Sequence, residues 1–485
     1  MNANIRRVGL LMIVLMLILA AQLTYLQVLD AGRLANDPRN SRTFLRDFTG
    51  PRGAIIDAAG KVLAHTVPSD DEYGRQRKYP LGDLFSQTVG YQSIVVGSVG
   101  IEKEYNDVLS GHDLKSVKID NLGELLLDKE HTANVILSMR ADAQQLAKDT
   151  LRGQKGSVVV LEPATGAIVA MYSTPSFDPQ PLAAHNPREV QVYFDLLNAD
   201  PSNPALPRAY RERYPPGSTF KIVTTAAALD TGIATPETDF PSVKSFTPPQ
   251  AGRPIENFGG RSCGGDLESV FVQSCNSAFA LLGVQLGELF PPQMRGFGIF
   301  EAPSIDLNPG AVVSLGPPEG SFSTNKPSFA LAGIGQGEVA TTPLQMALVA
   351  SGVANGGLIM TPHVAAEVRD GDGRILRTIK PKPWKQAMPV ATAMTIRDYM
   401  VQVVARGTGT AARISGVAVA GKTGTAQSCE TCDPHAWFVA FAPAEAPRYA
   451  IAVLVENGGS SGDEATGGRV AAPIAAKMLR FLLGL

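Results

Sequence analysis

The chain has 485 residues, and its 43 Lys and Arg against 45 Asp and Glu leave a formal net charge of −2. This balance argues against nucleic-acid binding, and a hydrophobic content of 44% excludes a wholly disordered protein. The 4 cysteines are too few for a disulfide-dense scaffold, and the 6 histidines lack the HExxH spacing of a zinc protease. We therefore expect a multidomain protein that uses no metal or other cofactor.

The N-terminal segment has the composition of a membrane anchor. Arg6 and Arg7 precede an apolar run over residues 8–29. About 20 such residues cross a hydrocarbon core of about 30 Å, and positive charge stays on the cytoplasmic side. A cleaved signal peptide is the competing interpretation, but its apolar core would span only about 7–15 residues. We expect a single-pass protein with residues 1–7 in the cytoplasm and the rest of the chain, beyond the anchor, outside.

Residues 30–152 are expected to form a small mixed front domain. Residues 52–64 alternate as strand, turn and strand, residues 134–137 resemble a short strand, and residues 138–151 have helical spacing. The region contains no nucleophile–base pair and no ligand cluster. We therefore expect a spacer or interaction module.

Residues 153–485 are expected to form a larger α+β domain. Predicted strands lie near both of its ends, at 157–161, 167–171, 437–442 and 449–455. Predicted helices lie between and after them, at 219–231, 269–287, 342–355 and 470–483. This order predicts one antiparallel sheet, assembled from both ends of the domain and flanked by helices.

A serine and a lysine one helical turn apart give the strongest chemical signal. Residues 214–221 read YPPGSTFK, and the Pro-Pro-Gly break predicts a helix that begins around Ser218. Residues i and i+3 share a helix face, so Lys221 can lie within hydrogen-bond reach of Ser218. A lysine with a lowered pKa can take the serine proton and so create a nucleophile. Alone the pattern is weak, because an N-cap serine and a solvated lysine would look the same.

Two further patterns strengthen this interpretation. Ser274 and Asn276 form S-x-N, and residues 422–424 form K-T-G after a predicted strand at 417–420. We expect Gly424 to allow close approach of substrate at an exposed strand end. In this order the three patterns are those of serine β-lactamases and penicillin-binding proteins.

The chain resembles the class B penicillin-binding proteins, which are monofunctional peptidoglycan D,D-transpeptidases, over nearly all of its length. Residues 52–60 are similar to the family's R-G-x-I-x-D-x-x-G segment, and residues 100–106 to its G-I-E-x-x-Y-N segment. Residues 335–346 resemble the segment that precedes the last motif. The compact chain is most similar to the actinobacterial penicillin-binding protein A subfamily.

The resemblance implies catalytic roles for five residues. Ser218 would attack the carbonyl of the penultimate D-Ala of a stem peptide, Lys221 would accept its proton, and the terminal D-Ala would leave. An amine from a neighbouring stem peptide would then resolve the acyl-enzyme. Ser274 and Asn276 would relay protons and orient the substrate amide, and Lys422 would contribute to the electrostatic field around Ser274.

The resemblance also implies binding roles and partners. Thr423, Gly424 and Thr425 would form the substrate-binding strand, with the two threonines on the terminal carboxylate. The oxyanion would rest on the backbone N–H groups of Ser218 and Thr425. Stem peptides and β-lactam antibiotics would be ligands, and a lipid-linked glycan polymerase with other wall-synthesis proteins would be partners. Septation is the expected setting.

Several other functions stay open at this point. A D,D-carboxypeptidase would carry the same motifs, and so would a membrane-anchored β-lactam sensor or an inactive divisome scaffold. A class A β-lactamase would need a water-activating glutamate in an E-x-x-L-N segment. The closest match is residues 304–308, where Ser304 stands in place of that glutamate. The anchor and the front domain also favour a wall-building enzyme.

The cysteines form two candidate pairs. Cys429, Cys432 and His435 are three local ligands without a fourth, which disfavours a structural zinc site. Outside the membrane a disulfide is easier to maintain than a thiol pair, so we expect a Cys429–Cys432 bridge. Cys263 and Cys275 can pair similarly, unless Cys275 is simply a small buried residue.

Overall fold

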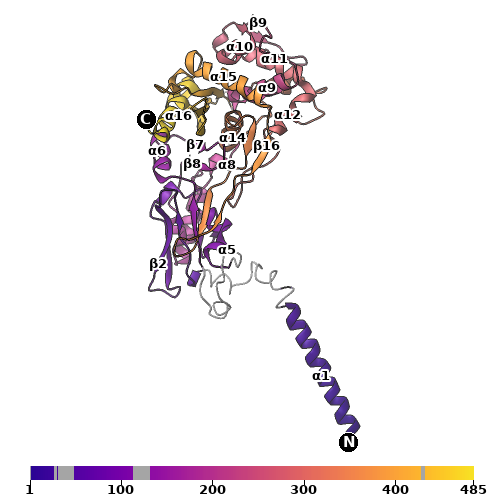
Figure 1. Ribbon diagram of the computed structural model, residues 1–485, viewed down its shortest axis with the longest axis vertical. Coiled ribbons are helices and arrows are strands. Elements are labelled where there is room, and N and C mark those ends of the chain that lie inside the picture. Colours follow the sequence, from indigo (N-terminus) through magenta and orange to yellow (C-terminus); the bar gives the residue numbers. More distant parts are fainter. Residues whose placement is uncertain (1, 27–29, 31–47, 113–131, 428–431) are drawn as a thin grey trace.

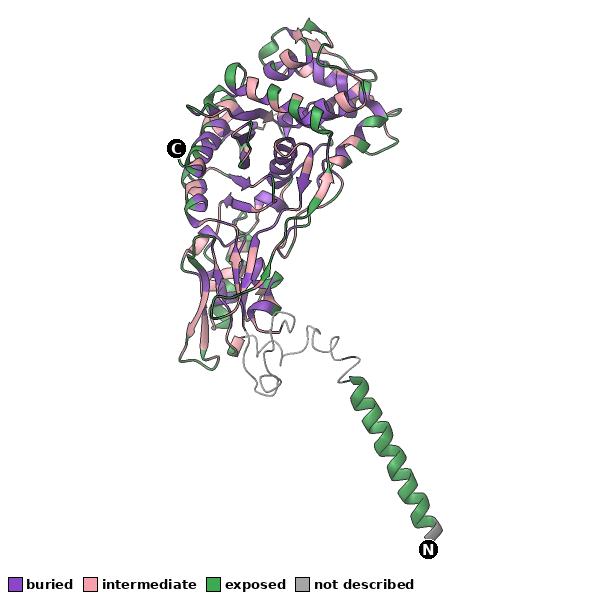
Figure 2. Ribbon diagram, viewed as in Figure 1, coloured by how far each residue is buried: buried purple, intermediate pink, exposed green. Residues whose placement is uncertain are grey.

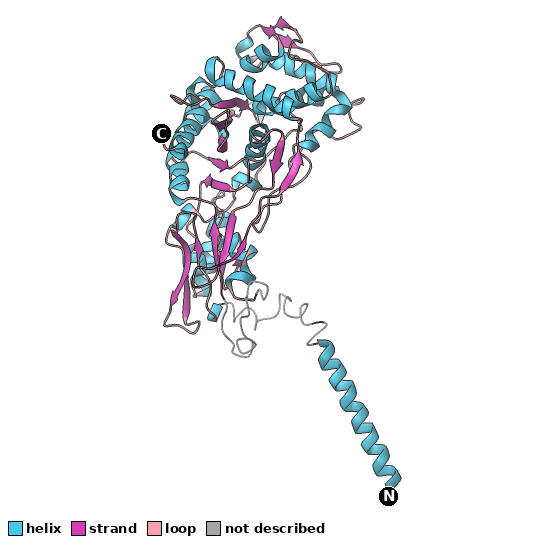
Figure 3. Ribbon diagram, viewed as in Figure 1, coloured by secondary structure: helices cyan, strands magenta, loops and turns pink. Residues whose placement is uncertain are grey.

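The computed structural model describes residues 2–26, 30, 48–112, 132–427 and 432–485, and the folded body is elongated (Figure 1). Helix α1 (Asn2–Thr24) is long and apolar enough to cross a membrane. Its residues are exposed along the described length (Figure 2). The front sheet lies at one end of the body, and most helices gather at the other (Figure 3). The α+β class predicted from the sequence is confirmed.

The front domain is built on a six-stranded sheet in the order β15-β14-β6-β1-β2-β3. Its strands are β1 (Ile55–Ile56), β2 (Val62–Pro68), β3 (Arg75–Lys78), β6 (Asn134–Leu137), β14 (Ala365–Arg369) and β15 (Ile375–Thr378). The strand–turn–strand predicted at 52–64 is the β1–β2 hairpin. Two strands therefore come from a hairpin more than 220 residues further along the chain than β6, counting from Leu137 to Ala365.

Helix α6 (Ala141–Leu151) begins at a buried carboxylate of the front sheet. Asp57 Oδ2 accepts the backbone N–H of Ala141 at 2.9 Å, and Asp57 Oδ1 accepts that of Lys61 at 2.7 Å. The helix itself packs against β8 (Ile168–Thr174) and α16 (Ala472–Leu483) of the second, larger domain, called the catalytic domain below because it carries the three predicted motifs. The predicted domain boundary between residues 152 and 153 does not separate the two packed units cleanly. Helix α6, which precedes it, packs on the second domain, and β14 and β15, which follow it, complete the sheet of the first. Sequence patterns are local, and these contacts are not.

A buried ionic cluster holds the front domain together. Glu102 is fully buried and accepts hydrogen bonds from Arg52 Nε at 2.8 Å and from Arg77 Nε at 2.7 Å. Arg52 also donates to Asn106 Oδ1 at 2.8 Å, and the hydroxyl of Tyr79 donates to Glu102 at 3.2 Å. Burial by itself would raise the pKa of Glu102, but the two guanidinium groups hold it below its usual value. The R-G-x and G-I-E-x-x-Y-N segments thus meet in one network.

The catalytic domain is built on a five-stranded antiparallel sheet in the order β17-β18-β19-β7-β8. Its strands are β7 (Gly156–Leu161), β8 (Ile168–Thr174), β17 (Ala420–Ala426), β18 (His435–Ala442) and β19 (Tyr449–Val455). The prediction of one sheet assembled from both ends of the domain is confirmed. Strand β17 lies at the edge, so one side of the K-T-G segment is left open for a ligand.

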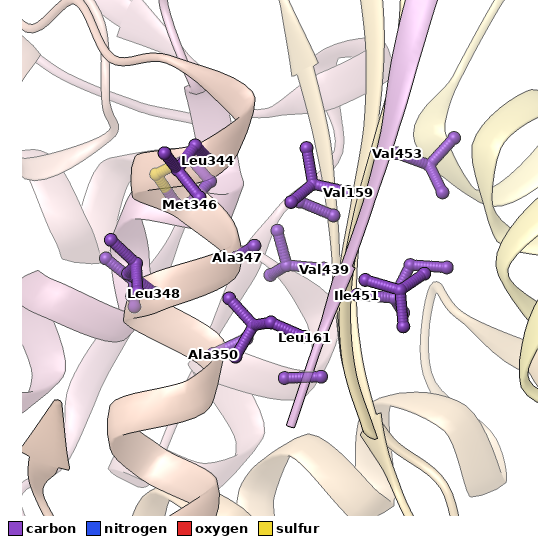
Figure 4. Close-up of a cluster of buried hydrophobic side chains, with 14 of the residues drawn as sticks. Val159, Leu161, Leu344, Met346, Ala347, Leu348, Ala350, Val439, Ile451 and Val453 are labelled. Atoms are coloured by element: carbon purple, nitrogen blue, oxygen red, sulfur yellow. The ribbon is translucent and has the colours of Figure 1, made fainter. Parts of the chain in front are cut away.

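Helices cover both faces of this sheet. The almost fully buried helix α14 (Pro343–Ala354) packs against β7, β18 and β19, and its Ala347 and Ala350 lie close to Val159 and Val439 (Figure 4). Val453 points to the other face (Figure 4), which α16 (Ala472–Leu483) covers. Because alanines line this contact, the helix axis can lie close to the sheet and hold the strands firmly.

Most of the other helices form a lobe beside the β17 edge of the sheet. They are α9 (Lys221–Asp230), α10 (Leu267–Gln273), α11 (Asn276–Leu286), α12 (Phe290–Gly296), α13 (Lys326–Gly333) and α15 (Val390–Arg406). The short helix α8 (Arg208–Arg211) packs instead on β7, β8 and α14, and α7 (Pro187–Ala199) packs on the 3-10 helix Gln180–Ala183. The prediction of a single helix over 269–287 is wrong, because the helix is interrupted between the end of α10 and the start of α11. Ser274 adopts a left-handed conformation there, with φ 63° and ψ 44°. Such backbone in a serine is uncommon and often marks a functional site.

The ionic cluster predicts how the front domain responds to mutation and pH. Glu102→Gln would leave two buried guanidinium groups without a counterion, so we expect the free energy of unfolding at pH 7 to fall by about 3–5 kcal/mol. Because folding lowers the pKa of Glu102, its stabilisation is complete above its unfolded pKa of about 4.3 and is lost as the pH falls through its folded pKa. The unfolding free energies of the wild type and of Glu102→Gln, measured in urea, should therefore become equal in acid.

The exposed neighbour Glu104 provides the control for this experiment. Glu104→Gln should leave the unfolding free energy within about 0.5 kcal/mol of the wild type. A loss as small as this for Glu102→Gln would contradict the role assigned to the cluster.

Candidate active site

The candidate nucleophile lies on a short 3-10 helix, Gly217–Phe220, that leads into α9. Ser218 is half-buried and lines a cleft of about 260 Å³. Gly217 has φ 55°, and a Cβ there would lie 2.7 Å from the carbonyl oxygen of Thr425. Only glycine therefore lets the serine turn come this close to strand β17.

Lys221 faces the S-x-N turn. It is fully buried, and its Nζ donates to the backbone oxygen of Ser274 at 2.8 Å, to Asn276 Oδ1 at 2.9 Å and to Ser274 Oγ at 3.3 Å. The expected hydrogen bond to Ser218 is not formed in the described part of the chain. Burial lowers the pKa of Lys221 well below its usual 10.5, and the cation of Lys422 lowers it further.

Lys422 approaches the same serine from the sheet. Its Nζ donates to Ser274 Oγ at 2.9 Å, and burial lowers the pKa of Lys422 to about 7. One hydroxyl thus lies between two buried amines that have no carboxylate beside them among the described residues. Two charges so close together in a poorly solvated site repel each other, which favours a state with at least one neutral amine.

The K-T-G residues lie inside β17, not after the strand predicted at 417–420. Gly424 is buried, and a Cβ there would lie 2.7 Å from the carbonyl oxygen of Pro216. The expectation that Gly424 admits substrate is therefore corrected: this glycine admits the serine turn. Thr423 Oγ1 lies 2.6 Å from Thr408 Oγ1, and Thr425 Oγ1 accepts the N–H of Gly467 at 3.4 Å.

The cleft brings most of the predicted residues together. Its lining includes five of them: Ser218, Ser274, Asn276, Thr423 and Thr425. Lys221 and Lys422 lie beneath, bonded to Ser274. The other lining residues were not predicted as site residues from the sequence; they are Phe258, Arg261, Gln273, Ile334, Gln336, Thr408, Thr466 and Gly468. Of these, only Gln336 stood in a segment that sequence resemblance had singled out.

A disulfide fixes the S-x-N turn. Cys263 and Cys275 are bonded, which confirms the second predicted pair. Cys275 is the middle residue of S-x-N and the N-cap of α11. Asn276 Nδ2 also donates to the backbone oxygen of Glu256 at 2.9 Å. The turn is therefore attached twice to the loop that precedes it.

The first predicted pair includes Cys429, which lies outside the described residues, so the Cys429–Cys432 bridge stays a prediction. His435 is a buried residue of β18 whose Nδ1 accepts the N–H of Asn457 at 3.1 Å. Burial lowers the pKa of His435, which favours the neutral ring that this bond needs. The residue acts in packing between the strand and the loop after β19.

A second polar network supports the serine turn from behind. Tyr214, just before Pro215, donates its hydroxyl to Glu456 Oε1 at 2.6 Å, and Arg208 Nε donates to the same oxygen at 2.9 Å. Trp437 Nε1 donates to the backbone oxygen of Pro215 at 3.0 Å. Burial raises the pKa of the Tyr214 phenol, and Glu456 raises it further, so the phenol stays a donor. Glu456 begins the loop that carries Thr466 to the cleft.

The segment compared with E-x-x-L-N lies away from the cleft. Asp306 accepts the backbone N–H groups of Val364 at 2.6 Å and Ala365 at 2.9 Å, and the hydroxyl of Tyr105 at 2.9 Å. The backbone oxygen of Asn308 accepts the N–H of Gly100 at 2.6 Å. Residues 304–308 thus join the catalytic domain to the front domain.

Comparison with known proteins agrees with this geometry. Residues 156–480 match the penicillin binding protein transpeptidase domain, and residues 52–136 match the penicillin binding protein A dimerisation domain. The chain belongs to the penicillin-binding protein transpeptidase family. The family resemblance inferred from the motifs is therefore confirmed.

Relatives of the same kind are similar over the whole chain. The peptidoglycan D,D-transpeptidase PbpA of Mycolicibacterium smegmatis is 37% identical, over 98% of this chain and 97% of the relative. PbpA of Mycobacterium tuberculosis is 35% identical, over 100% and 99%. The ceftriaxone acyl-enzyme complex of M. tuberculosis penicillin-binding protein A has a TM-score of 0.83 at 33% identity, covering 90% of this chain and 99% of that one. Its penicillin G acyl-enzyme complex has a TM-score of 0.81 at 33% identity, covering 90% and 100%.

The network behind the serine turn predicts a positioning role for Tyr214. Tyr214→Phe removes only the hydroxyl that binds the Glu456 carboxylate, a charged hydrogen bond of the kind that contributes about 1.5–3 kcal/mol. We expect a loss of stability in this range in urea unfolding, together with severalfold slower acylation by penicillin. Tyr193→Phe is the matched control, because Tyr193 binds only the backbone oxygen of Asp178 on the surface. Wild-type acylation by Tyr214→Phe would rule out the positioning role.

Proposed function

We propose that this protein is a peptidoglycan D,D-transpeptidase that works through a serine acyl-enzyme and is acylated by β-lactams. The observation that carries the proposal is the position of Ser274 Oγ between Lys221 and Lys422, beneath a cleft lined by Ser218. Full-length similarity to proteins named as D,D-transpeptidases, and structural similarity to acyl-enzyme complexes, support it.

Acylation starts with a neutral Lys221. Burial and the nearby Lys422 both lower the pKa of Lys221, so the free amine that can take the proton of Ser218 forms at a lower pH than in an ordinary lysine. Ser218 Oγ then bonds to the carbonyl carbon of the penultimate D-Ala. The resulting oxyanion would be held by the backbone N–H groups of Ser218 and Thr425, two residues that line the cleft. Each such donor is worth about 2.7–4 kcal/mol in comparable sites.

Collapse of the tetrahedral intermediate breaks the peptide bond and releases the terminal D-Ala. Its amine needs a proton, and Ser274 can pass one on, because its hydroxyl is bonded to both lysines. Thr423 and Thr425 bind the terminal carboxylate, and Asn276 orients the substrate amide. The amine of a second stem peptide then attacks the ester, and the same groups act in reverse to free Ser218.

The cleft favours a long-lived acyl-enzyme over hydrolysis. None of the described residues that line it is an aspartate or a glutamate. The only segment resembling the β-lactamase base lies against the front domain, with Asp306 occupied by backbone N–H groups. A β-lactamase role is therefore disfavoured. A D,D-carboxypeptidase would use the same residues with water as acceptor, so acceptor choice separates the two activities.

We also infer an extracytoplasmic location for the catalytic domain. Helix α1 can span a membrane, and Arg6 and Arg7 lie at its N-terminal end. By the positive-inside rule these arginines stay in the cytoplasm. Stem peptides are attached to glycan strands, so a membrane-bound polymerase that makes those strands is the partner the reaction requires. The front domain is the part of the chain available to contact it.

The nucleophile is tested by covalent labelling. Ser218→Ala should abolish labelling by a fluorescent penicillin, because the proposal places the acyl bond on Ser218 Oγ, whereas the Ser274 hydroxyl is already hydrogen-bonded to both lysines. Ser323→Ala, on an exposed loop, should label like the wild type, and its adduct should persist for many minutes. Peptide mass analysis identifies the modified residue. Labelling of Ser218→Ala, or turnover of penicillin near a median enzyme rate of ~10 s⁻¹, would overturn the proposal.

The two lysines predict a pH dependence. The acid limb of the acylation rate should lie below pH 10.5, because burial lowers the pKa of Lys221 well below this usual value. Lys422→Gln removes the cation that also lowers it, so the acid limb of the acylation rate should move to higher pH, in addition to any general loss of rate. Lys221→Arg should be inactive across the range, since a guanidinium stays protonated. An acid limb that stays in place would contradict the coupling of the two amines.

A further inference from the structure

The helix that begins with the S-x-N asparagine has no cap from its own N-terminal residue. Helix α11 begins at Asn276, and the side chain of its N-cap residue, Cys275, makes no capping hydrogen bond among the described residues. Cys275 is used instead in the disulfide to Cys263. The first N–H groups of a helix have no partner within the helix, so a side chain that accepts one of them stabilises the first turn. A cap for α11 therefore has to come from another segment.

Asn257 supplies this cap from the loop that precedes α10. Its Oδ1 accepts the backbone N–H of Ser277 at 2.9 Å. Its Nδ2 lies 2.8 Å from the backbone oxygen of Val243, 3.2 Å from that of Arg261 and 3.1 Å from Ser277 Oγ. Asn257 is only 5% exposed, so losing its amide would leave several buried polar groups unpaired. One buried amide thus joins a neighbouring strand and turn to the first turn of α11.

The residue before Asn257 orients the S-x-N asparagine. The backbone oxygen of Glu256 accepts Asn276 Nδ2 at 2.9 Å, and Asn276 Oδ1 accepts Lys221 Nζ at 2.9 Å. A side-chain amide has one donating end and one accepting end. Because the Glu256 carbonyl takes the donating end, the accepting end is turned to Lys221. The position of segment 256–257 therefore decides which end of Asn276 the lysine meets.

This orientation matters when Lys221 acts as a base. A neutral amine has two hydrogens and one lone pair. The two shortest contacts of Lys221 Nζ are the backbone oxygen of Ser274 at 2.8 Å and Asn276 Oδ1 at 2.9 Å, and both oxygens only accept. They can take both hydrogens, which leaves the lone pair available for the proton of the nucleophile. A rotated Asn276 would present its NH2 group to the amine and compete for that lone pair.

We propose that Asn257 is a positioning residue for acylation, which acts by fixing the place and orientation of Asn276. This inference rests on the proposed transpeptidase function. The described lining of the catalytic cleft does not include Asn257, so the residue acts through the turn and not on the substrate. Its side chain holds the first turn of α11 directly, and it holds the Glu256 carbonyl through the adjoining backbone.

The test measures how fast a fluorescent penicillin acylates the full-length protein. Asn257→Ala should be acylated about tenfold more slowly, equivalent to about 1.4 kcal/mol. The acid limb of its acylation rate should also move to higher pH, because a loosened turn admits water to Lys221, and burial is what lowers the pKa of that amine. Lys422, the other charged group bonded to Ser274, is present in both proteins and does not cause the difference.

Asn134→Ala is the matched control. Asn134 also accepts a backbone N–H, that of Ala54 at 2.7 Å, and donates to a backbone oxygen, that of Asp370 at 3.4 Å. It lies on β6 in the front sheet, away from the cleft. Both variants should unfold at a lower urea concentration than the wild type, but only Asn257→Ala should lose acylation rate and shift the acid limb. Wild-type acylation by Asn257→Ala would overturn the proposal.

A double variant separates positioning from a general loss of structure. If Asn257 acts through Asn276, adding Asn257→Ala to Asn276→Ala should slow acylation by less than about twofold beyond the single Asn276→Ala variant. Two losses that simply multiply would show that Asn257 acts independently, and would overturn the positioning role. A wild-type protein that penicillin does not acylate at all would instead contradict the transpeptidase proposal.

Discussion

The catalytic end of the molecule depends on two amines that share one hydroxyl. Lys221 and Lys422 come from a helix and a strand, are both fully buried, and both bond to Ser274 Oγ. Burying two amines with no carboxylate beside them is unfavourable while they carry charge, and it lowers their pKa values. The fold therefore places two amines of lowered pKa around one hydroxyl, with no acidic partner among the described residues, and the general base proposed for this site follows from that arrangement.

This arrangement requires close contact between elements that have no local reason to meet. Gly217 and Gly424 let the serine turn lie against β17, because a Cβ at either position would meet backbone atoms at 2.7 Å. Ser274 takes a left-handed conformation, which directs the turn between α10 and α11 toward both lysines. The disulfide at Cys275 holds that turn. Strain and glycines thus concentrate where the reacting groups must converge.

The motifs predicted which residues gather at the cleft, but less well how they meet there. Ser218, Ser274 and Lys422 could be found because their motifs are short and their chemistry is specific. The side chains Arg261, Thr408 and Thr466 belong to no periodic pattern, and they reach the cleft only through long-range folding. Periodicity also predicted one helix across 269–287, since apolar spacing continues through a break that only the conformation of Ser274 reveals.

The front domain is more than a spacer in physical terms. Its sheet is completed by β14 and β15, which lie within the catalytic half of the sequence, and β14 pairs directly with β6. Asp57 holds the start of α6, and that helix packs on β8 and α16 in the catalytic domain. A cut at residue 152 would expose the buried edge of β14 and remove α6 from the catalytic sheet. The two domains therefore share a core, and they are joined by packed secondary structure rather than by the chain connection alone.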